Sequence, residues 1–541
     1  MTAAPDVVVL GGGLAGLTCA LHLHKRCPDI RIHVLERRSH PAPEATHKVG
    51  ESTVEIGAHY FSQVLGLEAH LRECHLPKFG FRFFHSDGRD DIDGVQEIGV
   101  SRPLSVSSYQ IDRGIFENYL VTRARDLGIT VELGACVDGV DLAPPGTAQD
   151  RHAVRYRVGG CTGSLAPRWV IDASGRSSII KRQLKLDEAN GHDANAIWFR
   201  VPLRLDIEDW SADPCWLSRC SGGQRWRSTN HLVGEGYWVW LIPLSSGYHS
   251  VGIVADAGHH KLAKMNTFER ALGWLDVHQP RLSRALRETG AKPTDFTALR
   301  RFSYGCREVF SPDRWALTGE AGVFLDPFYS PGSDFIAIAN TYIVDLVERD
   351  LRKEPFAPYV GIYAQLFRSF YESTLTLYEG QYGLFADAEI MSAKVIWDYT
   401  YYWGILCQLF FQDRLTDVPM LGQVREKLLA ARALNDAMQP FFRAWKRVSA
   451  GRNVRLMLDQ AQLPWFAALN SSLSDDLDDA QFIVRIDHSA SRLRMLAAET
   501  VGRVVVDHPV AATWPETLRV LALSGHEAIM DGKLLEYPLT A

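Results

Sequence analysis

The order of apolar and polar residues along this chain predicts β-strands in some regions and α-helices in others. Residues 6–10 read D-V-V-V-L, an apolar run after Asp6 without alternation, as in a parallel strand buried on both faces. Residues 14–26 then carry apolar side chains at helical spacing. Alternation within residues 196–256 predicts an antiparallel sheet with one buried face. From about Glu372 onward, helical spacing predicts a helical C-terminal region.

A glycine-rich loop joins the first predicted strand to the first predicted helix. Residues 11–16 read G-G-G-L-A-G, which matches the G-x-G-x-x-G signature of dinucleotide-binding folds in its proper context. Gly11 permits the tight turn, Gly13 lets the backbone approach a pyrophosphate, and Gly16 lets helix and strand pack closely. Glu36 ends the second strand, where an acid binds ribose hydroxyls and suits FAD or NAD. The expected nucleotide-binding residues are Gly11, Gly13, Leu14, Ala15, Gly16 and Glu36.

Length and composition restrict the class of protein. The chain has 541 residues, which is long for one domain, and its 46% hydrophobic and 23% charged residues are ordinary for a globular protein. A net charge of −6 without a block of Lys and Arg argues against nucleic acid as a partner. Nine cysteines without a C-x-x-C pair predict no metal site and fit a cytoplasmic protein. No apolar stretch reaches the ~18 residues of a transmembrane segment.

Further segments carry the motifs of a known group of flavoproteins. Residues 109–117 read Y-Q-I-D-R-G-I-F-E, residues 171–176 read I-D-A-S-G-R, and residues 317–327 contain G-E-A-G followed by D-P. In this order they resemble the FAD motifs of the hydroxylase-type fold. Residues 238–243 read W-V-W-L-I-P. Together with the FAD motifs, this W-x-W-x-I-P hexad resembles that of the flavin-dependent halogenases, which include tryptophan, phenol and pyrrole branches.

The resemblance implies FAD as the cofactor and identifies residues that hold it. The segment V-G-E-S-T at residues 49–53 is similar to the family's loop beside the flavin. The family usually has Asp where this chain has Glu320, a longer acid that still reaches a ribitol hydroxyl. Beyond the glycine loop and Glu36, the resemblance implies FAD contacts at Gly50, Glu51, Arg113, Asp172, Gly319, Glu320 and Gly332.

The resemblance also implies a fold. We expect an α/β protein with a Rossmann-like FAD-binding domain, an inserted antiparallel substrate sheet and a C-terminal helical region. The FAD-binding domain is discontinuous in this family and is expected at about residues 1–85, 107–180 and 300–370. The interleaved substrate sheet is expected at about residues 86–106 and 181–299, and a helical cap at 371–541.

Lys78 is the predicted catalytic residue. It lies in the segment P-K-F-G-F-R-F at residues 77–83, which resembles the halogenase strand whose lysine projects into a tunnel between flavin and substrate. In that family a flavin hydroperoxide is attacked by halide, hypohalous acid results, and the lysine fixes where the electrophile is delivered. The indoles of the hexad keep substrate away from the flavin. The resemblance and the aromatic clusters place Trp238, Trp240, Ile242, Pro243, Tyr329, Trp397 and Trp403 along the tunnel or substrate wall.

A dense aromatic run in the C-terminal region supports two interpretations. Trp397 and Trp403 belong to it, together with Tyr399, Tyr401 and Tyr402. Aromatic residues dominate protein cores, so the run could pack a helical cap onto the FAD-binding domain. It could equally form a wall for an aromatic or conjugated substrate, and both interpretations hold if each helix uses two faces.

Two positions within residues 326–335 depart from the halogenase pattern. Tyr329 aligns near the glutamate that assists proton removal in the tryptophan branch, so an indole substrate is less expected. Pro331 aligns with one of two successive N–H groups that hold halide in the family, and proline has no N–H. Loss of one donor costs a buried anion on the order of 1–3 kcal/mol. The residues expected to hold chloride or bromide are Ser330, Gly332 and Ser333.

Together these observations favour a two-component FAD-dependent halogenase of secondary metabolism. Its substrate is expected to be electron-rich, aromatic or conjugated, and free or tethered to a carrier protein. The chain has no second G-x-G-x-x-G for NAD(P)H, so a separate flavin reductase is expected to supply reduced FAD. Pro331 favours instead an FAD monooxygenase or oxidase with an altered halide site. A flavin-binding protein without catalysis is the third interpretation.

Overall fold

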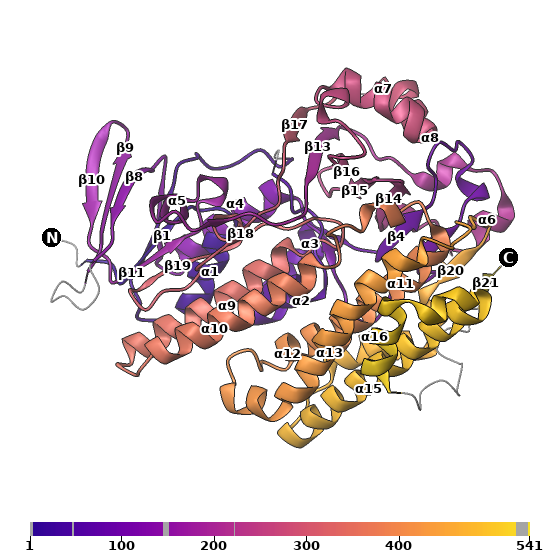
Figure 1. The fold of residues 1–541 in the computed structure, drawn as a ribbon. Coiled ribbons are helices and arrows are strands. Elements are labelled where there is room, and N and C mark those ends of the chain that lie inside the picture. The colour runs from indigo at the N-terminus through magenta and orange to yellow at the C-terminus, as the bar shows by residue number, and fades with distance from the viewer. Residues whose placement is uncertain are drawn as a thin grey trace. The chain divides into compact units, whose positions relative to one another are not determined.

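Two units, each assembled from three separated segments, make up the chain (Figure 1). The computed structural model describes residues 4–45, 48–143, 151–220, 222–290, 292–525 and 539–540. Unit 1 comprises Met1–His75, Ile111–Gly191 and Ser303–Phe370. Unit 2 comprises Leu76–Gln110, His192–Phe302 and Tyr371–Ala541. The segments of the two units therefore alternate along the sequence.

The apolar run near the N-terminus is the central strand of a parallel sheet in unit 1. All four side chains of β1 (Val7–Leu10) are buried, and a parallel strand pairs with it on each side. No side chain of β1 faces water, which explains the lack of alternation in its sequence. In sheet order the strands are β19 (Trp315–Leu317), β11 (Trp169–Asp172), β1, β2 (Ile32–Glu36) and β7 (Thr130–Leu133).

The helices of unit 1 confirm the predicted strand–loop–helix start. The first of them, α1 (Leu14–Arg26), begins where the glycine loop ends and spans the residues with helical spacing. The other helices are α2 (Glu55–His59), α3 (Glu68–Cys74), α4 (Arg113–Asp126), α5 (Ile179–Gln183), α9 (Gly332–Leu351) and α10 (Ala357–Leu375), whose last residues belong to unit 2. Smaller sheets are formed by β8 (Cys136–Asp141), β9 (Ala153–Val158) and β10 (Cys161–Leu165), and by β12 (Asp187–Glu188) with β18 (Gly305–Cys306).

The alternating residues 196–256 form the centre of a nine-stranded sheet in unit 2. The strands β13, β16, β15 and β14 pair in antiparallel fashion, as predicted. The pairs β14–β4 and β5–β20 are parallel, so the whole sheet is mixed and not purely antiparallel. Long connections lead to these pairs, and only a short hairpin forces strands to run in opposite directions. The order is β17 (Asp295–Leu299), β13 (Ala194–Val201), β16 (His249–Asp256), β15 (Tyr237–Pro243), β14 (Thr229–Gly234), β4 (Phe81–Phe84), β5 (Glu97–Gly99), β20 (Met457–Asp459) and β21 (Leu539–Thr540).

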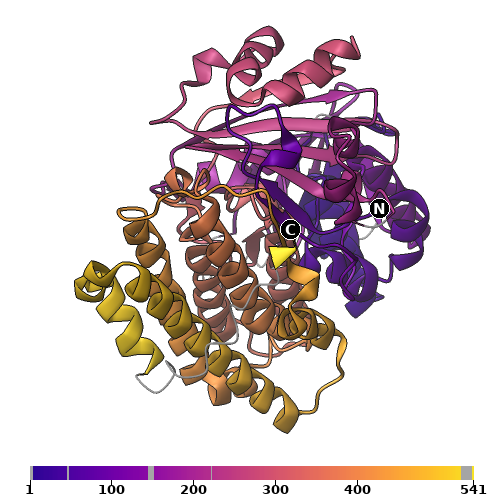
Figure 2. The ribbon, with the colours of Figure 1, turned by 90° about the vertical axis from the view of Figure 1, so that its right-hand side faces the viewer.

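The C-terminal region is helical, as its sequence predicts. Long helices α13 (Val418–Trp445) and α15 (Asp479–Asp507) run side by side, and α16 (Pro515–Ser524) packs against both (Figure 2). Asp478 starts α15 with a capping box. The remaining elements of unit 2 are β3 (Leu76–Pro77), β6 (Tyr109–Gln110), α6 (Pro214–Ser218), α7 (Phe268–His278), α8 (Pro280–Glu288), α11 (Ala388–Tyr401), α12 (Gln408–Phe411) and α14 (Pro464–Ser471).

Candidate functional site

The glycine loop of unit 1 is packed so closely at Gly11 and Gly16 that a side chain is excluded at these two positions. Gly11 has a φ of 107°, in the region that favours glycine. A Cβ on Gly11 would collide with the carbonyl of Ala173, and a Cβ on Gly16 would collide with the carbonyl of Gly11. Because α1 begins at Leu14, the N–H groups of its first turn have no acceptor within the helix. This cradle of N–H groups at the positive end of a helix fits a phosphate.

Glu36 places its carboxylate against the glycine loop. One carboxylate oxygen accepts the N–H of Gly12 at 2.7 Å, and the other accepts the N–H of Arg38 at 2.7 Å. The acid therefore lies beside the cradle, in the region where the sequence places an adenosine ribose. A contact with that ribose stays a prediction.

Asp172 ends β11 and Glu320 follows the neighbouring strand β19, and the two acids have different surroundings. The carboxylate of Asp172 accepts the N–H groups of Ser174 at 3.0 Å and Ile180 at 2.8 Å, so it shapes the loop after β11. Burial raises the pKa of Asp172. Burial also raises the pKa of Glu320, although the cationic side chains of Arg176, Arg113, Lys48 and Lys181 oppose that shift. Direct contacts of the two acids with a cofactor stay predictions.

A charged group lies beside the glycine loop and consists of Lys48, Arg113 and Glu117. Of these three residues, only Arg113 was predicted as a site residue. Glu117 is buried and pairs with both Lys48 and Arg113. A Cβ on Gly13 would lie 3.7 Å from the amine of Lys48. Arg113 also donates to the carbonyl of Val49, which fixes the start of the V-G-E-S-T segment. Burial lowers the pKa of Lys48, and Glu117 opposes that shift. The position of Lys48 directly before this segment is the sequence signal that could have found it.

The segment predicted to hold halide forms the turn that leads into α9. Tyr329 is half-buried and precedes Ser330, whose φ of 52° lies in the left-handed region. The N–H of Ser330 donates to the carbonyl of Pro327 at 2.9 Å. Pro331 directly precedes the helix, and its carbonyl accepts the N–H of Phe335 at 3.1 Å. The helix therefore starts without the N–H group that another residue would supply at position 331.

The first turn of α9 offers N–H groups and one buried hydroxyl. Gly332 is exposed and has open space beside its α-carbon. Ser333 is buried, and its hydroxyl has no hydrogen-bond partner among the residues that the structure describes. It packs against Gly57 of α2, whose N–H donates to Asp334 at 2.8 Å. A helix N-terminus with an unused hydroxyl presents two kinds of donor to an anion.

A buried polar cluster joins α9 to α1. The amide nitrogen of Asn340 lies 3.3 Å from the carbonyl of Ala15 and 3.2 Å from each of the hydroxyls of Thr18 and Tyr60. Its side-chain oxygen accepts the hydroxyl of Thr318 at 2.7 Å. One side chain in the middle of α9 thus links the beginning of α1 with the end of β19.

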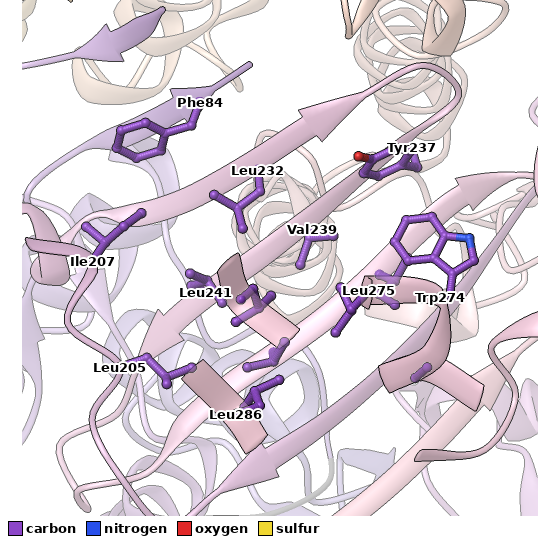
Figure 3. Close-up of a cluster of buried hydrophobic side chains, with 14 of the residues drawn as sticks. Phe84, Leu205, Ile207, Leu232, Tyr237, Val239, Leu241, Trp274, Leu275 and Leu286 are labelled. Carbon is purple, nitrogen blue, oxygen red and sulfur yellow. The ribbon is translucent and has the colours of Figure 1, made fainter. Parts of the chain in front are cut away.

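In unit 2 the W-x-W-x-I-P hexad lies within β15, and the two faces of this strand have different neighbours. The side chains of Tyr237, Val239 and Leu241 pack in a hydrophobic cluster that includes Trp274 of α7 (Figure 3). Successive side chains of a strand point to opposite faces. Trp238, Trp240 and Ile242 therefore lie on the other face.

Both indoles of the hexad are buried and hydrogen-bonded. Trp238 donates its indole N–H to the hydroxyl of Tyr382 at 2.9 Å, and Trp240 donates to the hydroxyl of Ser250 at 3.1 Å. The ring of Trp240 lies over Gly252 of the neighbouring strand, where a Cβ would collide with it. The two rings are fixed in place and form a rigid aromatic surface.

Lys78 belongs to the same aromatic surface. Its side chain is buried, and its amine lies 3.3 Å from the centre of the Phe81 ring. The Phe81 ring is 5.3 Å from that of His231, which is 5.2 Å from that of Trp238. The structure thus brings together the lysine and the hexad, which are far apart in the sequence. His231 carries no recognisable motif, and the sequence interpretation missed it.

The C-terminal tryptophans lie in two different surroundings within unit 2. Trp397 of α11 donates its indole N–H to Asn435 of α13 at 2.9 Å, so it packs between helices. Trp403 lies in the π-helix η9 (Tyr402–Cys407), 4.7 Å from the ring of Tyr399. Tyr399 is 6.2 Å from the ring of Phe81 and connects Trp403 to the aromatic surface around Lys78. Substrate contacts of either tryptophan stay predictions.

Neither a metal site nor a membrane-spanning helix is found in the described part of the chain. Within it, no three His, Cys, Asp or Glu side chains come together in a way that could hold a metal ion. None of its helices has both the length and the apolar character needed to cross a membrane.

Known proteins resemble this chain over most of its length. Residues 9–72 match the model of the NAD(P)-binding Rossmann-like domain. The flavin-dependent halogenase chlA of Dictyostelium discoideum is 26% identical over 470 residues, which cover 79% of this chain and 75% of that protein. The 1H-pyrrole-2-carbonyl-(peptidyl-carrier protein) chlorinase of Pseudomonas fluorescens is 27% identical over 405 residues, which cover 69% and 83%. These relatives support the predicted flavin-dependent halogenase family.

Solved halogenase structures share the fold of this chain. The crystal structure of the halogenase PltM has a TM-score of 0.66 and covers 96% of this chain and 99% of its own, at 16% sequence identity. At that identity the likeness shows the fold alone. The predicted family, its flavin-dependent enzyme class and the α/β fold with a Rossmann-like domain and helical C-terminal region are confirmed.

Proposed function

We propose that this member of the halogenase family binds FAD in unit 1 and halogenates an electron-rich aromatic or conjugated substrate. The observation that carries the proposal is the buried amine of Lys78, which lies on the aromatic surface that bears the hexad. The chlorinase relative is named for a carrier-bound pyrrole, which supports a substrate tethered to a carrier protein. A separate flavin reductase would supply reduced FAD.

The residues of unit 1 fit a dinucleotide such as FAD. The N–H groups at the start of α1 would hold the pyrophosphate, and Lys48 and Arg113 would balance its negative charge. Glu36 would accept hydrogen bonds from the adenosine ribose. When bound, reduced FAD would react with dioxygen and so supply the two-electron oxidant that converts halide into an electrophilic halogen.

Halide would bind at the first turn of α9. The N–H groups of Gly332 and Ser333 point away from the helix, as the first N–H groups of any helix do. The buried hydroxyl of Ser333 would provide a further donor in place of the N–H that Pro331 lacks. The positive end of the helix dipole favours an anion there.

Lys78 would hold the electrophilic halogen for transfer to the substrate. Its amine can donate a hydrogen bond to hypohalous acid or form a haloamine with it, and either keeps the halogen from being lost to water. The surrounding rings of Phe81, His231 and Trp238 exclude water and suit an aromatic substrate. The lysine would thereby decide which substrate carbon is attacked.

The test is the mass of the product formed with chloride or bromide, FAD, NADH and a supplied flavin reductase. The probes are a set of phenols and pyrroles, free and carrier-bound. Wild-type protein should give halide-dependent halogenated product, and Lys78→Ala should reduce its formation about 10²- to 10⁴-fold. Lys261→Ala, which removes an exposed lysine of unit 2, is the matched control. Unreduced product formation by Lys78→Ala would contradict the proposal.

Pro331 supports one alternative function, an FAD monooxygenase or oxidase on the halogenase scaffold. If the missing N–H prevents halide binding, reduced FAD and dioxygen would oxidise the substrate directly. Oxygenated product that forms equally with and without halide, and that Lys78→Ala does not reduce, would establish this alternative.

A further inference from the structure

We propose that Arg227 is the positioning residue for Lys78. The inference rests on the proposed function, because it assigns the residue that fixes the backbone from which the catalytic amine projects. Arg227 ends the short 3-10 helix η5 (Arg225–Arg227), just before β14, and lies in the same unit as Lys78.

The side chain of Arg227 binds the peptide group directly before Lys78. Two of its guanidinium nitrogens donate to the carbonyl of Pro77, at 3.2 and 2.9 Å. A third donates to the side chain of Gln224 at 2.8 Å, which holds the guanidinium in its plane. Pro77 has no N–H, so this carbonyl is its only backbone hydrogen-bonding group, and it accepts its hydrogen bonds from Arg227.

The backbone of Arg227 binds the peptide group directly after Lys78. The N–H of Phe79 donates to the carbonyl of Arg227 at 3.1 Å. Lys78 donates its own N–H to the carbonyl of Ser108 at 2.8 Å. Both peptide groups that flank Lys78 are therefore held, and Arg227 contributes to both of them.

The position of the Lys78 amine depends on this support because the chain turns immediately after it. Gly80 has a φ of 72°, and this turn brings Phe81 under the amine at 3.3 Å. A lysine side chain has several rotatable bonds, so its amine is positioned only where the backbone that carries it is fixed. If the backbone before the turn shifted by about 1 Å, the rate of a positioned reaction could fall about 10²-fold.

Lysine cannot replace the guanidinium of Arg227 fully. Arginine presents several N–H groups in a rigid plane, so it can bind Pro77 and Gln224 at once. A lysine amine is a single point charge on a flexible stem. We therefore expect Arg227→Lys to restore only part of what Arg227→Ala removes.

The experiment compares Arg227→Ala and Arg227→Lys with Arg204→Ala in full-length protein. Arg204 is the matched control because its exposed guanidinium lies over the neighbouring Trp226, 4.7 Å from the ring centre. With the reductase-coupled assay, kcat of Arg227→Ala should fall about 10- to 100-fold, while KM for substrate changes by less than about threefold. Arg227→Lys should recover part of this loss. The amount of free hypohalous acid, trapped by monochlorodimedone, should be higher with Arg227→Ala than with the wild type.

A second measurement does not depend on activity. The rate at which acetic anhydride modifies Lys78, read by peptide mass spectrometry against Lys261, should rise several-fold in Arg227→Ala and stay constant in Arg204→Ala. If Arg227→Ala does not fold, as judged by its melting curve, Arg227→Lys provides the same two readouts.

The failures of the two proposals are distinguishable. If Lys78→Ala loses activity but the Arg227 variants keep wild-type kcat and wild-type labelling of Lys78, the positioning role is overturned and the proposed function stands. If Lys78→Ala is fully active, the proposed function fails, and the labelling rate alone decides whether Arg227 fixes Lys78.

Discussion

A single N–H group is the smallest feature on which the proposed chemistry depends. Pro331 lies directly before α9, so the helix begins with one donor fewer than another residue would give. Ser333 places a buried hydroxyl in the same turn, and a hydroxyl can replace an N–H as a donor to an anion. We therefore expect halide to bind here, but more weakly than it would if residue 331 also supplied an N–H group.

Replacing Pro331 by Ala tests this expectation. Alanine restores the N–H and tolerates the φ of −75° found at this position. The bromide concentration that gives half-maximal product formation should fall about 5- to 30-fold, which corresponds to one regained donor. Pro358→Ala, at an exposed position in the first turn of α10, is the matched control. An unchanged bromide dependence in Pro331→Ala would show that halide binds elsewhere.

At the scale of elements, buried charges hold β4 and β5 together near Lys78. Arg82 of β4 and Arg225 of η5 both pair with Glu97 of β5, and all three side chains are fully buried. Burial alone would raise the pKa of Glu97, but the two guanidinium groups outweigh it and hold that pKa below its ordinary value. The network fixes the strand that carries Phe81 and the turn that ends in Arg227.

Glu97→Gln should lower the free energy of unfolding by about 3–5 kcal/mol, because two buried guanidinium groups lose their negative partner. The lowered pKa of Glu97 means that its stabilisation is complete above pH 4.5, its ordinary value, and is lost as the pH falls through the folded value. Urea unfolding should separate the wild type and Glu97→Gln most at neutral pH and less below pH 4.5.

The control for this substitution is Glu208→Gln, which removes a less buried partner of Arg225 and should cost much less. A difference between wild type and Glu97→Gln that stays constant from neutral to acid pH would contradict the assigned ionisation.

The contacts between elements also explain which features could be predicted from the sequence and which could not. The glycine loop, the hexad and Lys78 are each recognised from a local pattern, so their identity needs no knowledge of the fold. Arg227 contacts Pro77 across 150 residues, through the pairing of β14 with β4. Strand register is set by tertiary packing, and no local pattern records it. The parallel pairs of the unit 2 sheet escaped prediction for the same reason.

At the scale of the whole molecule, the alternation of segments makes each unit depend on distant parts of the chain. The nine-stranded sheet draws β4 and β5 from Leu76–Gln110, its central strands from His192–Phe302, and β20 from the C-terminal segment. The edge of β5 is covered only when β20 is present. The C-terminal helices are therefore a structural part of unit 2.

A chain that ends at residue 370 should not fold into a stable protein. It would lack β20, α11 and all later helices, and would expose the edge of β5 and a large apolar surface. Soluble yield and a cooperative melting curve, measured beside the full-length chain, check this expectation. A soluble fragment with a sharp melting transition would contradict it.

The Asn340 cluster has a consequence for anyone who wishes to change the halide preference of this protein. One amide joins the beginning of α1 to the middle of α9, and the N-terminal ends of these two helices are proposed to receive the cofactor phosphates and the halide. Two ligands that bind to one connected frame influence each other equally in both directions. A larger anion that displaces α9 would therefore change the affinity of the protein for flavin. Selection for bromide over chloride would then yield compensating substitutions around Thr18, Tyr60 and Asn340, deep in unit 1, and not only beside the anion.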